Sequence, residues 1–159
     1  RQFQSSNLFE DLQNALRETQ IDSKQLAIEI TESIMMKYIN SSLLTLKEVK
    51  ELGISIYLDD FGTGYSSLSY LNSFPIDTLK IDKSFVDAIT KDEKVNNSLL
   101  VNTIIAMGKS LDIKVIAEGV EEKVQFEFLK SKECDIIQGY YFSKPLPEKE
   151  FIALLQKGL

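Results

Sequence analysis

The chain has 159 residues, of which 43% are hydrophobic and 26% are charged, and its net charge is −6. This size predicts one domain over residues 1–159, no apolar run is long enough to span a bilayer, and the acidic surface would repel DNA or RNA. The absence of histidine excludes a typical zinc site and a Ser-His-Asp triad, which leaves oxygen ligands for any metal ion. With its single Cys134, the chain is expected to be a cytoplasmic protein without a membrane segment.

Helices and strands are predicted to alternate along the chain. Apolar spacing and breaker residues predict, in order, a helix over 7–19, a strand over 26–30, a helix over 42–52, a strand over 54–58, a short helix over 65–73, a strand over 78–82, a helix over 95–111, a strand over 113–117, a helix over 122–131, a strand over 134–138 and a helix over about 148–157. Such alternation is typical of parallel βαβ units.

Most of the predicted strands have one aliphatic face and end near an ionisable side chain. In the strand at 54–58, for example, every second residue is Ile or Leu. The opposite faces of four strands carry Glu29, Asp59, Lys80 and Glu118 near their C-terminal ends. This favours a closed barrel, which gathers such groups at one mouth, over an open doubly wound sheet, which the alternation also fits.

Carboxylates gathered at one mouth would repel each other unless cations lay among them, so the pattern predicts divalent metal binding. Each carboxylate taken alone is better explained as a solvated loop residue or a helix cap, and only the four matched positions together favour a metal site.

Five motifs in this order resemble the EAL domain family. They are EITES at 29–33, LDDFGTGYSSL at 58–68, LKID at 79–82 followed by SFV at 84–86, IAEGVE at 116–121, and QGYYFSKPLP at 138–147. The resemblance implies a (β/α)8 TIM-like barrel of the EAL type, and hydrolysis of cyclic di-GMP to linear pGpG with two Mg²⁺ or Mn²⁺ ions.

The resemblance also implies roles for the metal and catalytic groups. Glu29 and Asp59 would bind metal, with Asp59 bridging, and Asp60 would hold the second ion. Lys80 would orient the attacking water, and Glu118 would bind the second metal ion or assist proton transfer.

A second set of residues would support the substrate and the loops. Gln138 and Asp82 would serve the substrate, and Glu32 and Glu121 would anchor loops. The family resemblance further implies a homodimer and a GGDEF or sensor domain elsewhere in the full protein.

The sequence departs from the family pattern in one respect, because it contains no Glu-Ala-Leu motif. A full barrel needs roughly 250 residues, whereas about five βα units are predicted here. We therefore expect a partial EAL domain, a C-terminal piece whose own activity is absent or weak.

Two other functional classes fit part of the pattern. One is a non-catalytic cyclic di-GMP receptor or regulatory dimerisation module. The other is a different Mg²⁺ barrel enzyme of the enolase kind, which also places lysine and carboxylates at strand ends. The order of the motifs favours the first of these two over the second.

Overall fold

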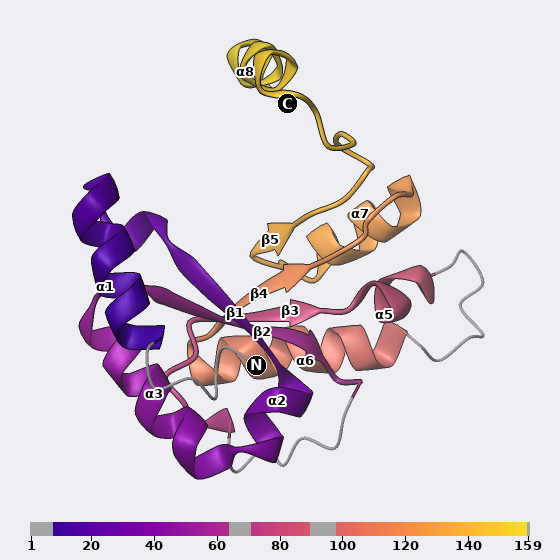
Figure 1. The fold of residues 1–159 in the computed structure, drawn as a ribbon. Coiled ribbons are helices and arrows are strands. Elements are labelled where there is room, and N and C mark those ends of the chain that lie inside the picture. The colour runs from indigo at the N-terminus through magenta and orange to yellow at the C-terminus, as the bar shows by residue number, and fades with distance from the viewer. Residues whose placement is uncertain (1–7, 64–70, 90–97, 159) are drawn as a thin grey trace. The chain divides into compact units, whose positions relative to one another are not determined.

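The structure is a computed structural model that describes residues 8–63, 71–89 and 98–158 (Figure 1). It divides into two compact units, the first comprising Arg1–Lys80 and Gly108–Lys114, and the second Ile81–Met107 and Val115–Leu159. The described elements are α1 (Leu8–Thr19), η2 (Ser23–Gln25), β1 (Ala27–Thr31), α2 (Glu32–Lys37), α3 (Ile39–Glu51), β2 (Ser55–Phe61), β3 (Thr78–Ile81), α5 (Lys83–Asp87), α6 (Ser98–Leu111), β4 (Lys114–Ala117), α7 (Lys123–Ser131), β5 (Ile136–Ile137) and α8 (Glu148–Lys157).

The first unit is built on β1, β2 and β3, which are neighbours in that order. β1 and β2 are parallel, with Ile28 opposite Ile56 and Ile30 opposite Leu58. The alternation of β2 explains its place in the core, because Ile56 and Leu58 are fully buried while the residues between them are half-buried. Burying each such side chain contributes about 2 kcal/mol. α1 contacts α3, and α2 contacts both β1 and β2 (Figure 1).

Asp77, just before β3, organises the end of the first unit at which the strands begin. Its N–H donates to Ile56 O at 3.0 Å, and its carboxylate accepts from Ile56 N–H at 2.8 Å and from Lys50 Nζ at 2.7 Å. Its carbonyl accepts from Lys114 N–H at 3.1 Å. One aspartate therefore ties β2, β3, the end of α3 and the first residue of β4 together.

The second unit contains β4 and β5, which pair in parallel with Ile116 opposite Ile136. α6 buries Val101, Ile104 and Ile105, which recur at helical spacing on one face. α7 begins with a capping box between Glu122 and Gln125. α8 has no buried residue and ends an extended segment that follows β5 (Figure 1). None of the described helices is long and apolar enough to cross a membrane.

The predicted fold class is confirmed, since the chain is an α/β protein with five parallel strands. Two short helices, α2 and α5, were not predicted, and β5 is only two residues long. All four residues of β3 are buried, including Lys80, so this strand is covered on both faces. The helix predicted at 65–73 falls largely on residues 64–70, which lie outside the described part of the chain.

Candidate functional site

Lys80 is the centre of the predicted site in the first unit. Its side chain is only 6% exposed, and its ammonium lies 2.8 Å from Glu29 Oε1 and 3.2 Å from Asp59 Oδ1. The three residues come from β3, β1 and β2, so three neighbouring parallel strands bring them together. A buried ammonium is costly unless paired, and two carboxylates compensate this one. Sequence reasoning identified all three residues.

Asp60 interrupts the regular backbone of β2 directly after Asp59. It has φ of +55°, a left-handed conformation that Asp tolerates better than most residues. The buried positions of β2 change there from every second residue, Ile56 and Leu58, to Phe61 three residues on. Two consecutive aspartates are consequently both half-buried, where a regular strand would place them on opposite faces.

Glu32 holds the turn that follows β2. Glu32 is 1% exposed, and its Oε2 accepts from Gly62 N–H at 2.9 Å. Gly62 has φ of +96°, which a residue with a side chain adopts only under strain. The other oxygen, Oε1, is buried and has no hydrogen-bond partner within the part of the chain that is described. This contact joins Glu32 to the loop after β2. The loop-anchoring role that the resemblance implies for Glu32 stays a prediction.

In the second unit, Glu118 and Gln138 directly follow the neighbouring strands β4 and β5. Backbone hydrogen bonds join the two loops on which they lie. Glu118 N–H donates to Ile81 O at 3.2 Å, and Gln138 N–H donates to Ala117 O at 2.9 Å. Val120 N–H in turn donates to Gln138 O at 3.0 Å. The loops touch so closely at Gly139 that a Cβ there would lie 2.0 Å from Val120 O.

Asp82 and Glu121 have structural partners of their own in the second unit. Asp82 caps α5, accepting from Ser84 N–H at 3.0 Å and from the Ser84 hydroxyl. Glu121 pairs with Lys83 at 3.2 Å, and Lys83 also pairs with Asp87 at 2.6 Å. The Asp87 carboxylate, to which Lys83 donates a hydrogen bond, raises the pKa of Lys83, with a smaller contribution from Glu121.

Sequence reasoning missed two residues that hold the loop after β4, Lys83 and Gln125. The buried Gln125 accepts from Glu121 N–H at 2.8 Å and from Glu122 N–H at 2.9 Å, and donates to Val86 O at 3.3 Å. The capping-box spacing from Glu122 to Gln125 was a usable signal for the bond from Glu122 N–H. Nothing local to Gln125 indicated Val86.

Cys134 is not a candidate nucleophile. Burial raises the pKa of its thiol to about 11, so the thiol is protonated at neutral pH.

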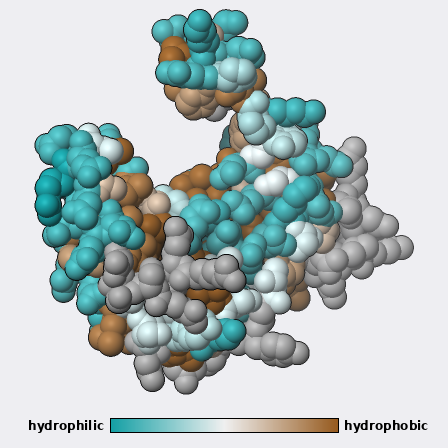
Figure 2. Space-filling model, viewed as in Figure 1, coloured by the Kyte–Doolittle hydropathy of each residue, from teal (hydrophilic) through white to brown (hydrophobic). Residues whose placement is uncertain are grey.

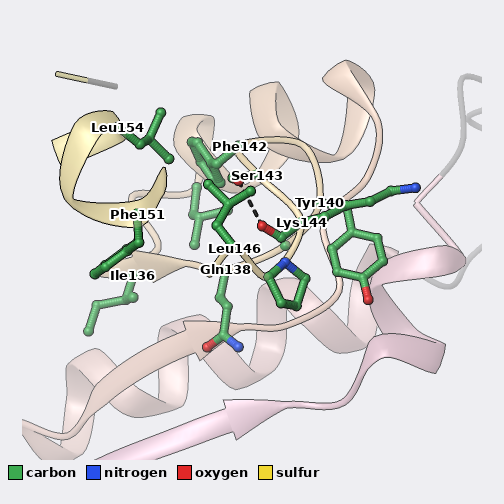
Figure 3. A pocket seen from close by; sticks show the side chains of 12 residues that line it. Ile136, Gln138, Tyr140, Phe142, Ser143, Lys144, Leu146, Phe151 and Leu154 are labelled. Atoms are coloured by element: carbon green, nitrogen blue, oxygen red, sulfur yellow. Dashed lines mark hydrogen bonds between the residues drawn. The ribbon is translucent and has the colours of Figure 1, made fainter. Parts of the chain in front are cut away.

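A cavity of about 550 Å³ lies in the second unit beside the segment after β5 (Figure 3). Phe151 and Leu154 from α8 line one side and Tyr140 lies on the other. Gln138 is the one predicted site residue among those that line it, and neither Lys80 nor its two partners do. The lining is mostly apolar. Because Lys80, Glu29 and Asp59 are not among the lining residues, this cavity is distinct from the charged cluster that they form.

The described residues include no group of three carboxylate or thiol side chains close enough to hold a metal ion. Glu29 and Asp59 nevertheless already share one cation, because both lie within 3.2 Å of the Lys80 ammonium. Their carboxylates are hard oxygen donors, and the chain has no histidine. The residues present therefore fit an ion such as Mg²⁺, Mn²⁺ or Ca²⁺ better than zinc.

The model of one protein family, the EAL domain, matches residues 1–145. The signaling protein YkoW of Bacillus subtilis is 48% identical over 95% of this chain, which corresponds to 19% of YkoW. The bifunctional diguanylate cyclase/cyclic di-GMP phosphodiesterase MucR of Pseudomonas aeruginosa is 38% identical over 96% of the chain and 22% of MucR. The chain thus spans about a fifth of the length of these curated relatives.

Solved structures agree with these sequence matches. The PaMucR phosphodiesterase in complex with c-di-GMP has a TM-score of 0.89 and 37% identity, covering 94% of this chain and 60% of that one. The manganese/cy-diGMP complex of Klebsiella pneumoniae BlrP1 at pH 6 has a TM-score of 0.79 and 29% identity, covering 91% and 36%. The family match over most of the chain, together with these structures, shows that the chain belongs to the EAL domain family.

Proposed function

We propose that the protein containing this chain hydrolyses cyclic di-GMP to the linear dinucleotide pGpG. Membership of the EAL family and a relative named as a cyclic di-GMP phosphodiesterase support this proposal. The observation that carries it is the buried Lys80 ammonium between Glu29 and Asp59, on three neighbouring parallel strands. This arrangement combines oxygen ligands for cations with a fixed positive charge.

Glu29, Asp59 and Asp60 are proposed to hold divalent cations, with Glu118 as a further ligand or a proton-transfer group. When bound, such cations lower the pKa of a water molecule and offset the charge of a phosphodiester. The left-handed backbone at Asp60 supports a shared role for Asp59 and Asp60, because it keeps both half-buried. We propose that Gln138 and Asp82 serve the substrate, and that Glu32 and Glu121 hold the loops.

Lys80 is proposed to orient water and phosphate oxygens by its charge. Its side chain is 6% exposed, so this charge acts where water screens it little. The two carboxylates fix the ammonium in position before substrate arrives, which is the condition for electrostatic stabilisation of a transition state.

The test is turnover of cyclic di-GMP by the full-length protein and its Lys80→Met variant, with Mg²⁺ present. We expect kcat/KM to fall at least about 100-fold, because a positioned charge and proton-transfer partner is lost. Lys114→Met is the matched control, since this exposed lysine also lies on a strand and should leave kcat/KM unchanged.

Two results would contradict the proposal. One is undiminished turnover by Lys80→Met. The other is binding of cyclic di-GMP without hydrolysis by the wild-type protein under any divalent metal, which would instead establish a receptor or regulatory module.

The finer features of the proposal are Mg²⁺ or Mn²⁺ as cofactor, a homodimer, a GGDEF or sensor domain in the full protein, and a cytoplasmic location. The manganese complex of BlrP1 supports a divalent ion. The exposed apolar side chains of α8 support self-association. Chelation should abolish turnover, and titration with each metal in turn would identify the one preferred.

A further inference from the structure

The loop that carries Glu118 packs directly on the side chain of Lys83. Gly119 has φ of +68°, and a Cβ at this position would lie 2.4 Å from Lys83 Cγ and 2.6 Å from Lys83 Cδ. The aliphatic stem of Lys83 therefore fills the space where any other residue at 119 would place its side chain. This contact is possible only because residue 119 is glycine.

The ammonium of Lys83 extends the contact beyond Gly119. It reaches Glu121 Oε1 at 3.2 Å and Asp87 Oδ1 at 2.6 Å, so it joins the loop to α5. Two residues before Lys83, Ile81 O accepts from Glu118 N–H at 3.2 Å. The loop is thus held at both ends, by a backbone bond at Glu118 and by an ion pair at Glu121, with the lysine stem between them.

We propose that Lys83 is a positioning residue that fixes Glu118 for the reaction. The proposal rests on the proposed function, because Glu118 has a task only if the site turns over a phosphodiester. Lys83 itself is not proposed to touch the substrate. It acts by restricting the four-residue loop from Glu118 to Glu121, whose geometry sets where the Glu118 carboxylate lies.

The experiment compares Lys83→Met, Lys83→Arg and Asp87→Asn in the full-length protein. Methionine keeps an apolar stem against Gly119 but removes the charge that reaches Glu121. Arginine restores a charge that is able to pair with Glu121. Asp87→Asn is the matched control, because it removes the partner of Lys83 within α5 and leaves the pairing with the loop in place.

Two readouts are measured. The first is kcat and KM for cyclic di-GMP, and the second is hydrogen exchange of the amides of residues 118–121 without substrate. A half-exposed ion pair supplies up to about a fivefold effect. We expect Lys83→Met to lower kcat about fivefold with KM unchanged, and to speed exchange of these amides by about the same factor. Lys83→Arg and Asp87→Asn should match the wild type in both.

The outcomes test the positioning role of Lys83 and the proposed function independently. Unchanged exchange in Lys83→Met, or faster exchange with an unaltered kcat, overturns the positioning role. A fall in kcat that arginine does not rescue also overturns it. If the wild-type protein does not hydrolyse cyclic di-GMP at all, the proposed function fails, while the exchange rates still decide whether Lys83 holds the loop.

Discussion

At the scale of single residues, the left-handed backbone of Asp60 has the largest consequence for the first unit. A strand alternates its side chains, so consecutive aspartates would normally face opposite sides. With φ of +55° at Asp60, Asp59 and Asp60 are both half-buried, and Phe61 returns to the core at 5% exposure. Asp60 N–H donates to Asp59 Oδ1 at 3.1 Å, which also helps to fix the orientation of the Asp59 carboxylate.

The conformation of Asp60 predicts that stability depends on the residue type there. Alanine lacks the short polar side chain that makes left-handed backbone tolerable, whereas asparagine retains it. We expect Asp60→Ala to lower the free energy of unfolding by about 1 kcal/mol relative to Asp60→Asn, as measured by urea denaturation. Both variants remove the same charge, so their difference isolates the backbone effect. Equal stability of the two variants would refute this explanation.

At the scale of elements, α7 stabilises the loop after β4 through one buried side chain. Gln125 accepts two hydrogen bonds from the backbone of Glu121 and Glu122, and donates one to Val86 O at the end of α5. A single amide thereby satisfies two backbone N–H groups and adds a second hydrogen bond to Val86 O, which also accepts from Ile89 N–H. Because buried polar groups are costly when unpaired, the arrangement couples α5, α7 and the loop.

Replacing Gln125 with leucine should therefore destabilise the protein although the side chain keeps its approximate size. Two N–H groups lose their partner, whereas Val86 O keeps the bond from Ile89 N–H at 3.0 Å. We expect a loss of about 2–3 kcal/mol in the free energy of unfolding. The control is Glu127→Leu, an exposed position of the same helix whose ion pair with Lys123 is long, at 3.5 Å. That variant should change stability by less than about 0.5 kcal/mol. Thermal denaturation of both variants gives the comparison, and similar losses in the two would contradict the role of Gln125.

At the scale of the whole molecule, charge and apolar surface have opposite effects on association. The net charge of −6 favours separate chains. Against it, the side chains of Phe151, Ile152 and Leu155 on α8 are 50%, 46% and 58% exposed. Figure 2 shows hydrophobic surface on this helix. Apolar side chains gathered on one short helix are more typical of a contact surface than scattered ones.

This surface predicts that the 159-residue chain self-associates through α8. We expect the double variant Phe151→Ser and Leu155→Ser to weaken association at least about tenfold, since each buried apolar side chain contributes about 2 kcal/mol. Sedimentation equilibrium measures the dissociation constant. Leu44→Ser is the control, because Leu44 is 66% exposed on α3, away from α8 in the sequence. A monomeric wild-type chain at all accessible concentrations would rule out the prediction.

The sequence by itself determined most of the secondary-structure elements and the residues of the charged cluster around Lys80. The alternation of Ile54, Ile56 and Leu58 predicts a half-buried strand, and five such strands between amphipathic helices predict an α/β fold. The alternation of side chains predicts that Glu29, Asp59 and Lys80 lie on the non-aliphatic faces of their strands, and the structure pairs them. The roles of these residues in metal binding and hydrolysis stay predictions until they are measured.

The rest required the tertiary structure, for two physical reasons. The helices α2 and α5 have six and five residues, which is too short for a 3.6-residue period to emerge from the sequence. Val86, the distant partner of Gln125, and Gly62, the partner of Glu32, lie 39 and 30 residues away, so no local pattern contains them. Local side-chain periodicity determines which elements form, whereas the choice of partner for a buried polar group depends on which distant segments the packed core brings within hydrogen-bond range.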